Sequence, residues 1–172
     1  MSIDFAFAYM NSQAQWSIYG NTSLSVISFI NMDGQFLISK EGFVATLTAE
    51  AGFDAGVVGA RGAFEADFWW TASGRLGPYA SVEVEAWALE IIKINAGLKG
   101  ALIAERSSYL LFATAYADAC LGPICWNGQV WVSLENGSAD GGLGDGGGYA
   151  DRIEAARNKA RQMLNLAETA KQ

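Results

Sequence analysis

The stretch GARGAFEA (Gly59–Ala66) returns 38 residues later as GLKGALIA (Gly97–Ala104). Both copies lie inside long stretches in which apolar and polar residues alternate. Alternation with a period of two is typical of β-strands that cover one face, and its return at a fixed spacing indicates repeated hairpins. The sequence therefore predicts a β scaffold built from similar units.

Alternation of the same kind runs from Ile3 to Leu134 and is interrupted only by short polar or glycine-containing segments. Short connections favour antiparallel pairing of consecutive strands over crossover connections. We therefore predict a mainly β fold, an antiparallel meander of about 8–10 strands that forms a curved sheet or a β-sandwich, plus one C-terminal α-helix.

Turn residues suggest where the strands end. Asp-Gly tolerates the positive φ angles of a type I′ turn, and the phase of the alternation changes after Val57, as it does at a turn or a bulge. The expected turns and reversals are Gly20–Thr22, Asn31–Gly34, Lys40–Gly42, Gly56–Gly62, Asn95–Gly97 and Gly122–Pro123.

The chain divides into three predicted segments: an antiparallel β domain at 1–136, a glycine-rich linker at 137–148, and an amphipathic helix at 149–172. Seven glycines make the middle segment a flexible connection. Apolar residues then recur at helical spacing. We expect the helix either to lie back on the sheet or to link to a neighbouring domain. Its apolar stripe consists of Ile153, Ala156, Ala160, Met163, Leu164 and Ala167.

Charge and composition exclude several classes of function. The net charge is −7, divided into −9 before Asp151 and +2 from Asp151 onward. An acidic body repels phosphate backbones, so we expect no nucleic-acid partner. The chain contains no histidine, which removes the commonest general base and the commonest metal ligand. We therefore predict no enzymatic activity, no metal and no cofactor. No apolar run reaches the roughly 18–20 residues of a membrane helix, so no membrane span is expected.

Cys120 and Cys125 are the two cysteines, and they flank a Gly-Pro turn. This spacing allows a small disulfide loop, while two half-buried thiols remain the alternative. A disulfide implies an oxidising compartment, so we expect an extracellular or cell-surface location. The N-terminal residues carry no leader pattern. The chain is then either cytoplasmic or a domain excised from a larger secreted protein.

Six tryptophans are many for a chain of this length. Exposed aromatic rings among polar groups stack on sugars or form protein interfaces. The candidate binding residues are Trp69, Trp87 and Trp131, together with Glu83 and Glu85. The two glutamates share one strand face, yet a carboxylate pair on a polar face does not by itself predict hydrolysis.

These observations favour a non-enzymatic structural or interaction module, a self-assembling subunit or a domain of a larger secreted or cell-surface protein. Its partner is then another protein or a second copy of the chain. The alternative is a ligand-binding β-sandwich or barrel that holds a glycan or an apolar molecule between strands that carry exposed tryptophans.

Overall fold

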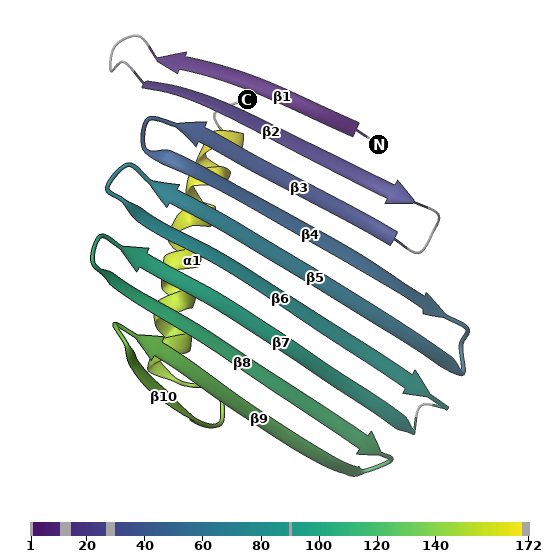
Figure 1. Ribbon diagram of the computed structural model, residues 1–172. Helices are drawn as coiled ribbons and strands as arrows, with labels where there is room; N and C mark the ends of the chain where they lie inside the picture. Colours follow the sequence, from purple (N-terminus) through teal and green to yellow (C-terminus); the bar gives the residue numbers. More distant parts are fainter. Residues whose placement is uncertain (1, 11–14, 27–29, 90, 170–172) are drawn as a thin grey trace.

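A computed structural model describes residues 2–10, 15–26, 30–89 and 91–169, and these form one sheet of ten strands and one helix (Figure 1). The spatial order of the strands is their order in the sequence, and every neighbouring pair is antiparallel. The predicted mainly β meander with a C-terminal helix is confirmed. It takes the form of one open sheet, and the described residues form no second sheet.

The central strands are 12 to 14 residues long. The elements are β1 Ser2–Met10, β2 Gln15–Val26, β3 Ile30–Ser39, β4 Gly42–Asp54, β5 Val58–Thr71, β6 Arg75–Ala88, β7 Ile92–Glu105, β8 Ser108–Leu121, β9 Ile124–Glu135, β10 Ser138–Leu143 and α1 Gly148–Thr169.

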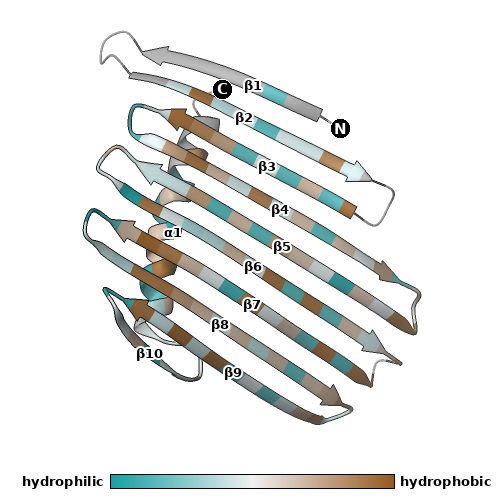
Figure 2. Cartoon of the chain, in the orientation of Figure 1, coloured by the Kyte–Doolittle hydropathy of each residue, from teal (hydrophilic) through white to brown (hydrophobic). Residues whose placement is uncertain are grey.

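Hydrophilic and hydrophobic residues alternate along the strands (Figure 2), and this alternation gives the sheet two chemically different faces. Val44 in β4 lies opposite Leu37 and Trp69, all three on the face that α1 covers. Its neighbour Ala45 points to the other face and lies opposite Phe36 and Phe68. Because side chains alternate along each strand, this register keeps one set of residues on each face. We call these the helix face and the apolar face.

α1 crosses the strands on the helix face, behind the sheet in Figure 1. Its residues Ile153, Ala160 and Leu164 are buried and join the side chains of the strands in one core. Aspartate Asp145 precedes the helix and accepts a hydrogen bond from the Gly147 amide at 2.9 Å. Of the two arrangements considered for the helix, packing on its own sheet is the one observed. Residues 170–172 of the predicted helix lie outside the described part of the chain.

Several predicted turns are wrong for one physical reason. Asp33-Gly34 lies inside β3, and a Cβ atom at Gly34 would sit 3.2 Å from the Thr22 methyl group on β2. Asn95–Gly97 lies inside β7, where a Cβ atom at Gly97 would sit 2.4 Å from the ring of Tyr116. Both glycines therefore serve close packing between strands, and neither reverses the chain.

Of the remaining turn predictions, one is wrong, one is correct in part and two are confirmed. Gly20–Thr22 lies within β2, so no turn occurs there. The reversal predicted at Gly56–Gly62 occurs at residues 55–57, and the rest of that segment belongs to β5. Turns at residues 40–41 and at Gly122–Pro123 are confirmed.

The predicted linker at 137–148 differs from the structure because Ser138–Leu143 forms β10 and pairs with β9. Strand pairing uses backbone groups, so a segment with few bulky side chains can still add to a sheet edge. Gly141 and Gly142 lie opposite Val132 and Trp131. The glycine-rich composition predicts a flexible linker, but it contains no information about the hydrogen bonds to β9 that order this segment.

Candidate functional site

The first candidate is a charged cluster between the sheet and α1. Asp67 on β5 is 3% exposed and accepts hydrogen bonds from Arg157 and from Arg161, the latter at 3.0 and 3.1 Å. Glu65, two residues earlier on the same face, pairs with both arginines. The Arg157 guanidinium also lies 3.9 Å from the ring centroid of Tyr79. Every charge of this cluster has an opposite charge beside it.

The pKa shifts of the cluster show that its two arginines are stabilised in their charged form. Burial by itself would lower the pKa of Arg157, but the hydrogen bond and charge of Asp67 outweigh it and raise that pKa. The pKa of Arg161 is raised in the same way. Both guanidinium groups therefore stay protonated and do not exchange protons as general acids or bases. The cluster therefore holds the helix on the sheet.

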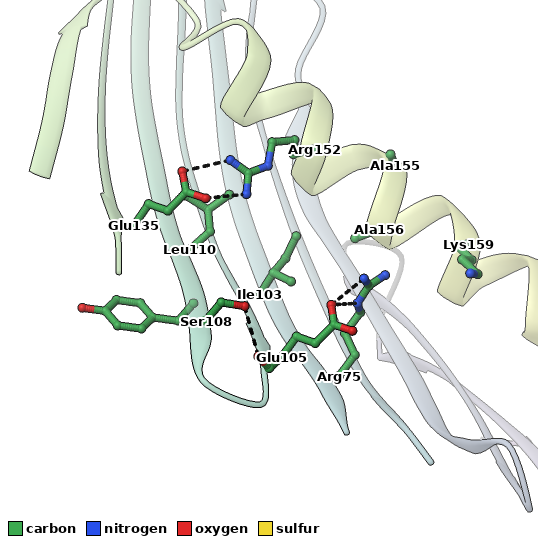
Figure 3. Close-up of a pocket in the computed structure, with 11 residues that line it drawn as sticks. Arg75, Ile103, Glu105, Ser108, Leu110, Glu135, Arg152, Ala155, Ala156 and Lys159 are labelled. Carbon is green, nitrogen blue, oxygen red and sulfur yellow. Dashed lines mark hydrogen bonds and ion pairs between the residues drawn. The ribbon is translucent and has the colours of Figure 1, made fainter. Parts of the chain in front are cut away.

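A crevice of about 410 Å³ between α1 and the ends of β7–β9 is the second candidate (Figure 3). Arg75 donates to Glu105 at 2.7 Å, and Arg152 donates to Glu135 at 2.7 and 3.0 Å. The hydrogen bond from Arg75 lowers the pKa of Glu105, and the hydrogen bond from Arg152 lowers that of Glu135. Both carboxylates therefore remain ionised at neutral pH, where neither can serve as a general acid.

The third candidate is the apolar face. Among the described side chains of β2 to β10, this face carries no Asp, Glu, Lys or Arg. Large apolar groups on it remain exposed, as at Leu98 (57%), Val132 (59%) and Trp126 (61%). Removing such a large apolar surface from water is favourable.

The predicted site residues do not come together at one place. Trp69 is 2% exposed in the core, where a Cβ atom at the opposite residue Gly77 would meet its ring at 2.0 Å. Trp131 is half-buried beside α1, with its ring centroid 5.4 Å from that of Tyr149 and 6.4 Å from that of Phe112. These two tryptophans are packed inside the protein, and their proposed role in binding stays a prediction.

Glu83, Glu85 and Trp87 share the helix face on β6, in the half of that face away from the buried core. Trp87 is half-buried, and a Cβ atom at the opposite residue Gly59 would meet its ring at 2.1 Å. Burial, followed by the hydrogen bond to Glu83, raises the pKa of Tyr116 to about 12. Glu83 and Glu85 are exposed on the same strand face as half-buried Trp87, and a role of these three residues in binding remains a prediction.

The two cysteines are joined in a disulfide, with Cys120 and Cys125 opposite each other across the β8–β9 hairpin. The exposed tryptophans that sequence reasoning did not select are Trp70 (48%) and Trp126 (61%), both on the apolar face. The signal that could have identified them is the phase of the alternation, because Trp70 shares the phase of Phe64 and Phe68, which lie among apolar residues.

Comparison with known proteins gives no family for this fold: no family model, curated protein or solved structure matches the chain. Within the described ranges, no helix is long and apolar enough to cross a membrane. In the same part of the chain, no group of three or more His, Cys, Asp or Glu side chains is placed to hold a metal ion.

Proposed function

We propose that this protein is a non-enzymatic interaction module that binds its partner through the apolar face of the sheet. One observation carries the proposal: the described side chains of this face include no charged group, while large apolar side chains on it stay exposed. Monomeric soluble proteins rarely expose a contiguous apolar patch of more than a few hundred Å². A face of this kind is typical of a surface that is covered in use.

The helix face supports the same proposal by contrast. There, α1 and the charged cluster of Glu65, Asp67, Arg157 and Arg161 cover one half of the sheet. The chain thus provides its own cover for that half of the helix face, and the described residues provide none for the apolar face. Since an apolar sheet face is normally buried against another element, the uncovered apolar face points to a partner.

Cysteine accessibility tests this proposal directly. A Leu98→Cys variant places a thiol on the apolar face, and a Glu85→Cys variant places one on the exposed polar half of the helix face. We expect maleimide to label the Leu98→Cys protein at least tenfold more slowly than the Glu85→Cys protein. In unfolding concentrations of urea the two rates should become equal, which controls for intrinsic reactivity.

Equal labelling rates in the native protein would refute the proposal, because an unoccupied face exposes Leu98 as fully as Glu85. The native cysteines are held in their disulfide and do not compete for the reagent. The labelling is done in cells or extracts of the natural source, where any partner is present, so that the experiment does not depend on the identity of the partner.

A ligand-binding function is the second candidate and has its own supporting observation. A hollow of about 660 Å³ on the helix face is lined by polar groups that include Lys99, Tyr116, Asp118 and Gln129. Hydroxyl-bearing ligands such as glycans suit such a lining. Calorimetric titration with a panel of oligosaccharides tests it, and heat that persists in a Tyr116→Ala variant would place any binding elsewhere.

The proposed location is extracellular or on a cell surface. The disulfide between Cys120 and Cys125 supports it, because such bonds persist in oxidising compartments. Migration of the natural protein on non-reducing gels after rapid thiol blocking would test whether the bond is present in the cell.

A further inference from the structure

We propose that the occupant of the apolar face is a second copy of this chain, packed face to face across a two-fold axis that runs along β6. This inference rests on the proposed function and adds the identity of the partner. Three features of the molecule support it: the ridge and hollows of the apolar face, the area of that face, and the distribution of charge over the two faces.

The apolar face carries an aromatic ridge. Phe68 and Trp70 on β5 are 38% and 48% exposed, and the ring of Phe43 on β4 lies 5.8 Å from that of Phe68. Leu47 on β4 extends the same ridge and is 36% exposed. Large rings therefore stand above the sheet on two neighbouring strands.

An apolar hollow lies on the other side of β6. It has a volume of about 690 Å³, and its floor is formed by small residues at equivalent positions of three strands, Ala80, Gly100 and Ala113. Larger residues such as Leu102 and Leu111 border it. Beyond the ridge, a second apolar hollow of about 570 Å³ lies between β2 and β4.

Ridge and hollow lie at similar distances from β6, on opposite sides of it. A two-fold axis along β6 places β5 of one copy against β7 of the other, and β4 against β8. By the register of the strands, Leu47 of each copy then faces Ala113 on the floor of its partner's hollow, and Phe68 faces Leu102 at the border of that hollow. A surface that is complementary to itself in this way is what a two-fold symmetric interface requires.

The area of the face is sufficient for a stable pair. An axis along β6 makes β3 to β9 face one another, and seven strands about 4.8 Å apart with about 40 Å of length each cover roughly 1,300 Å² per copy. Two copies then bury about 2,600 Å², which lies within the range of obligate dimers. Aligned face-to-face packing of two such sheets is a common arrangement.

Charge distribution permits this pairing and disfavours others. Among the described side chains, the charged groups lie on the helix face, at the strand ends, in the turns and on α1. In the face-to-face pair, both helices and both helix faces point away from the interface. Two acidic copies can therefore associate without bringing their carboxylates together.

The test is the mass in solution, measured by light scattering over a hundredfold range of concentration. We expect 36.6 kDa, twice the chain mass of 18.3 kDa. A Val82→Lys variant puts two ammonium groups opposite each other at the axis and should shift the mass to that of one chain. Val82 is 45% exposed within one copy, so a single copy tolerates the change.

The matched control is Ser81→Lys, one residue earlier on β6 and on the helix face, where Glu65 lies opposite. This variant should keep the wild-type mass. A Val82→Cys variant should also form covalent dimers with a bismaleimide that spans about 10 Å, the separation of packed sheets. A Ser81→Cys variant should not.

Three results would overturn the second copy as occupant. The first is a wild-type mass of 18.3 kDa at every concentration. The second is a Val82→Lys variant that keeps the doubled mass, which would place the contact at the sheet edges. The third is a single chain that floats with phosphatidylcholine vesicles, which would make lipid the occupant. If Leu98→Cys is still protected from maleimide, the interaction face stands and only its partner changes.

Discussion

Asp67→Asn is the change that tests most sharply how α1 is held on the sheet. The Asp67 side chain is 1% exposed and accepts three hydrogen bonds from Arg157 and Arg161. Hydrogen bonds to charged groups contribute about 1.5–3 kcal/mol each, and breaking a buried ion pair costs about 3–5 kcal/mol. The amide retains one acceptor and Glu65 still pairs with both arginines. We therefore expect a loss near the lower limit, about 3 kcal/mol.

Equilibrium unfolding in urea measures this loss. With a slope of about 2 kcal/mol per molar urea, a loss of about 3 kcal/mol lowers the midpoint by about 1.5 M. Tryptophan fluorescence, to which buried Trp69 contributes, reports on the sheet, and far-ultraviolet circular dichroism reports on α1. Protein concentration is kept fixed, because association of copies would make the midpoint depend on it.

The matched control is Glu135→Gln, which breaks the other ion pair between α1 and the sheet. That pair joins Arg152 and Glu135 with side chains 52% and 34% exposed, and exposed pairs contribute little to stability. Equal midpoint shifts for Asp67→Asn and Glu135→Gln would refute the reasoning. So would a double variant, Asp67→Leu with Arg157→Met, that is less stable than Asp67→Asn, since an apolar pair should replace much of the lost stabilisation.

Two further predictions concern the helix face. Because the pKa of Tyr116 is raised from 10.0 to about 12, its contribution to stability is complete below pH 10 and is lost as the pH rises toward 12. Glu83→Gln should move the tyrosinate absorbance transition of Tyr116 part of the way toward pH 10, since burial, the larger cause, remains. An unchanged transition would contradict the contribution of Glu83. Gly77→Ala should destabilise by about 1–3 kcal/mol, because its Cβ atom would lie 2.0 Å from the ring of Trp69. In Gly148→Ala the added Cβ atom has no atom within 4 Å, and a comparable loss of melting temperature there would refute the steric explanation.

Alternation alone was sufficient to predict the sheet. In β5, Phe64, Ala66 and Phe68 keep one phase while Glu65 and Asp67 keep the other, and the structure places the two sets on opposite faces. A period of two is a direct consequence of strand geometry. For the same reason the helix was predicted from its own period, and its start differs from the expected one by a single residue.

The positions of turns and the pairing of charged side chains could not be predicted from the alternation of apolar and polar residues. Gly97 and Gly34 have the local composition of turn residues, yet each lies mid-strand beneath or beside a side chain of the next strand. A glycine that enables a turn and a glycine that makes room for a ring are identical in one sequence. The ion pairs of Asp67 with Arg157 and Arg161 span 90 and 94 residues. Only the placement of α1 on the sheet brings these groups together.

The division of the sheet into two unlike faces also bears on how the fold is stabilised. The core that the described residues form lies on the helix face, between α1 and one half of the sheet. On the other side, apolar residues of the strands contribute little unless another layer removes them from water. The free energy of folding is the small difference between the favourable burial of apolar surface and the unfavourable loss of chain entropy. A single copy of this sheet leaves one apolar face unburied and therefore lacks the stabilisation that its burial would give. Pairing of two apolar faces would supply further burial, and the midpoint of unfolding should therefore rise with protein concentration.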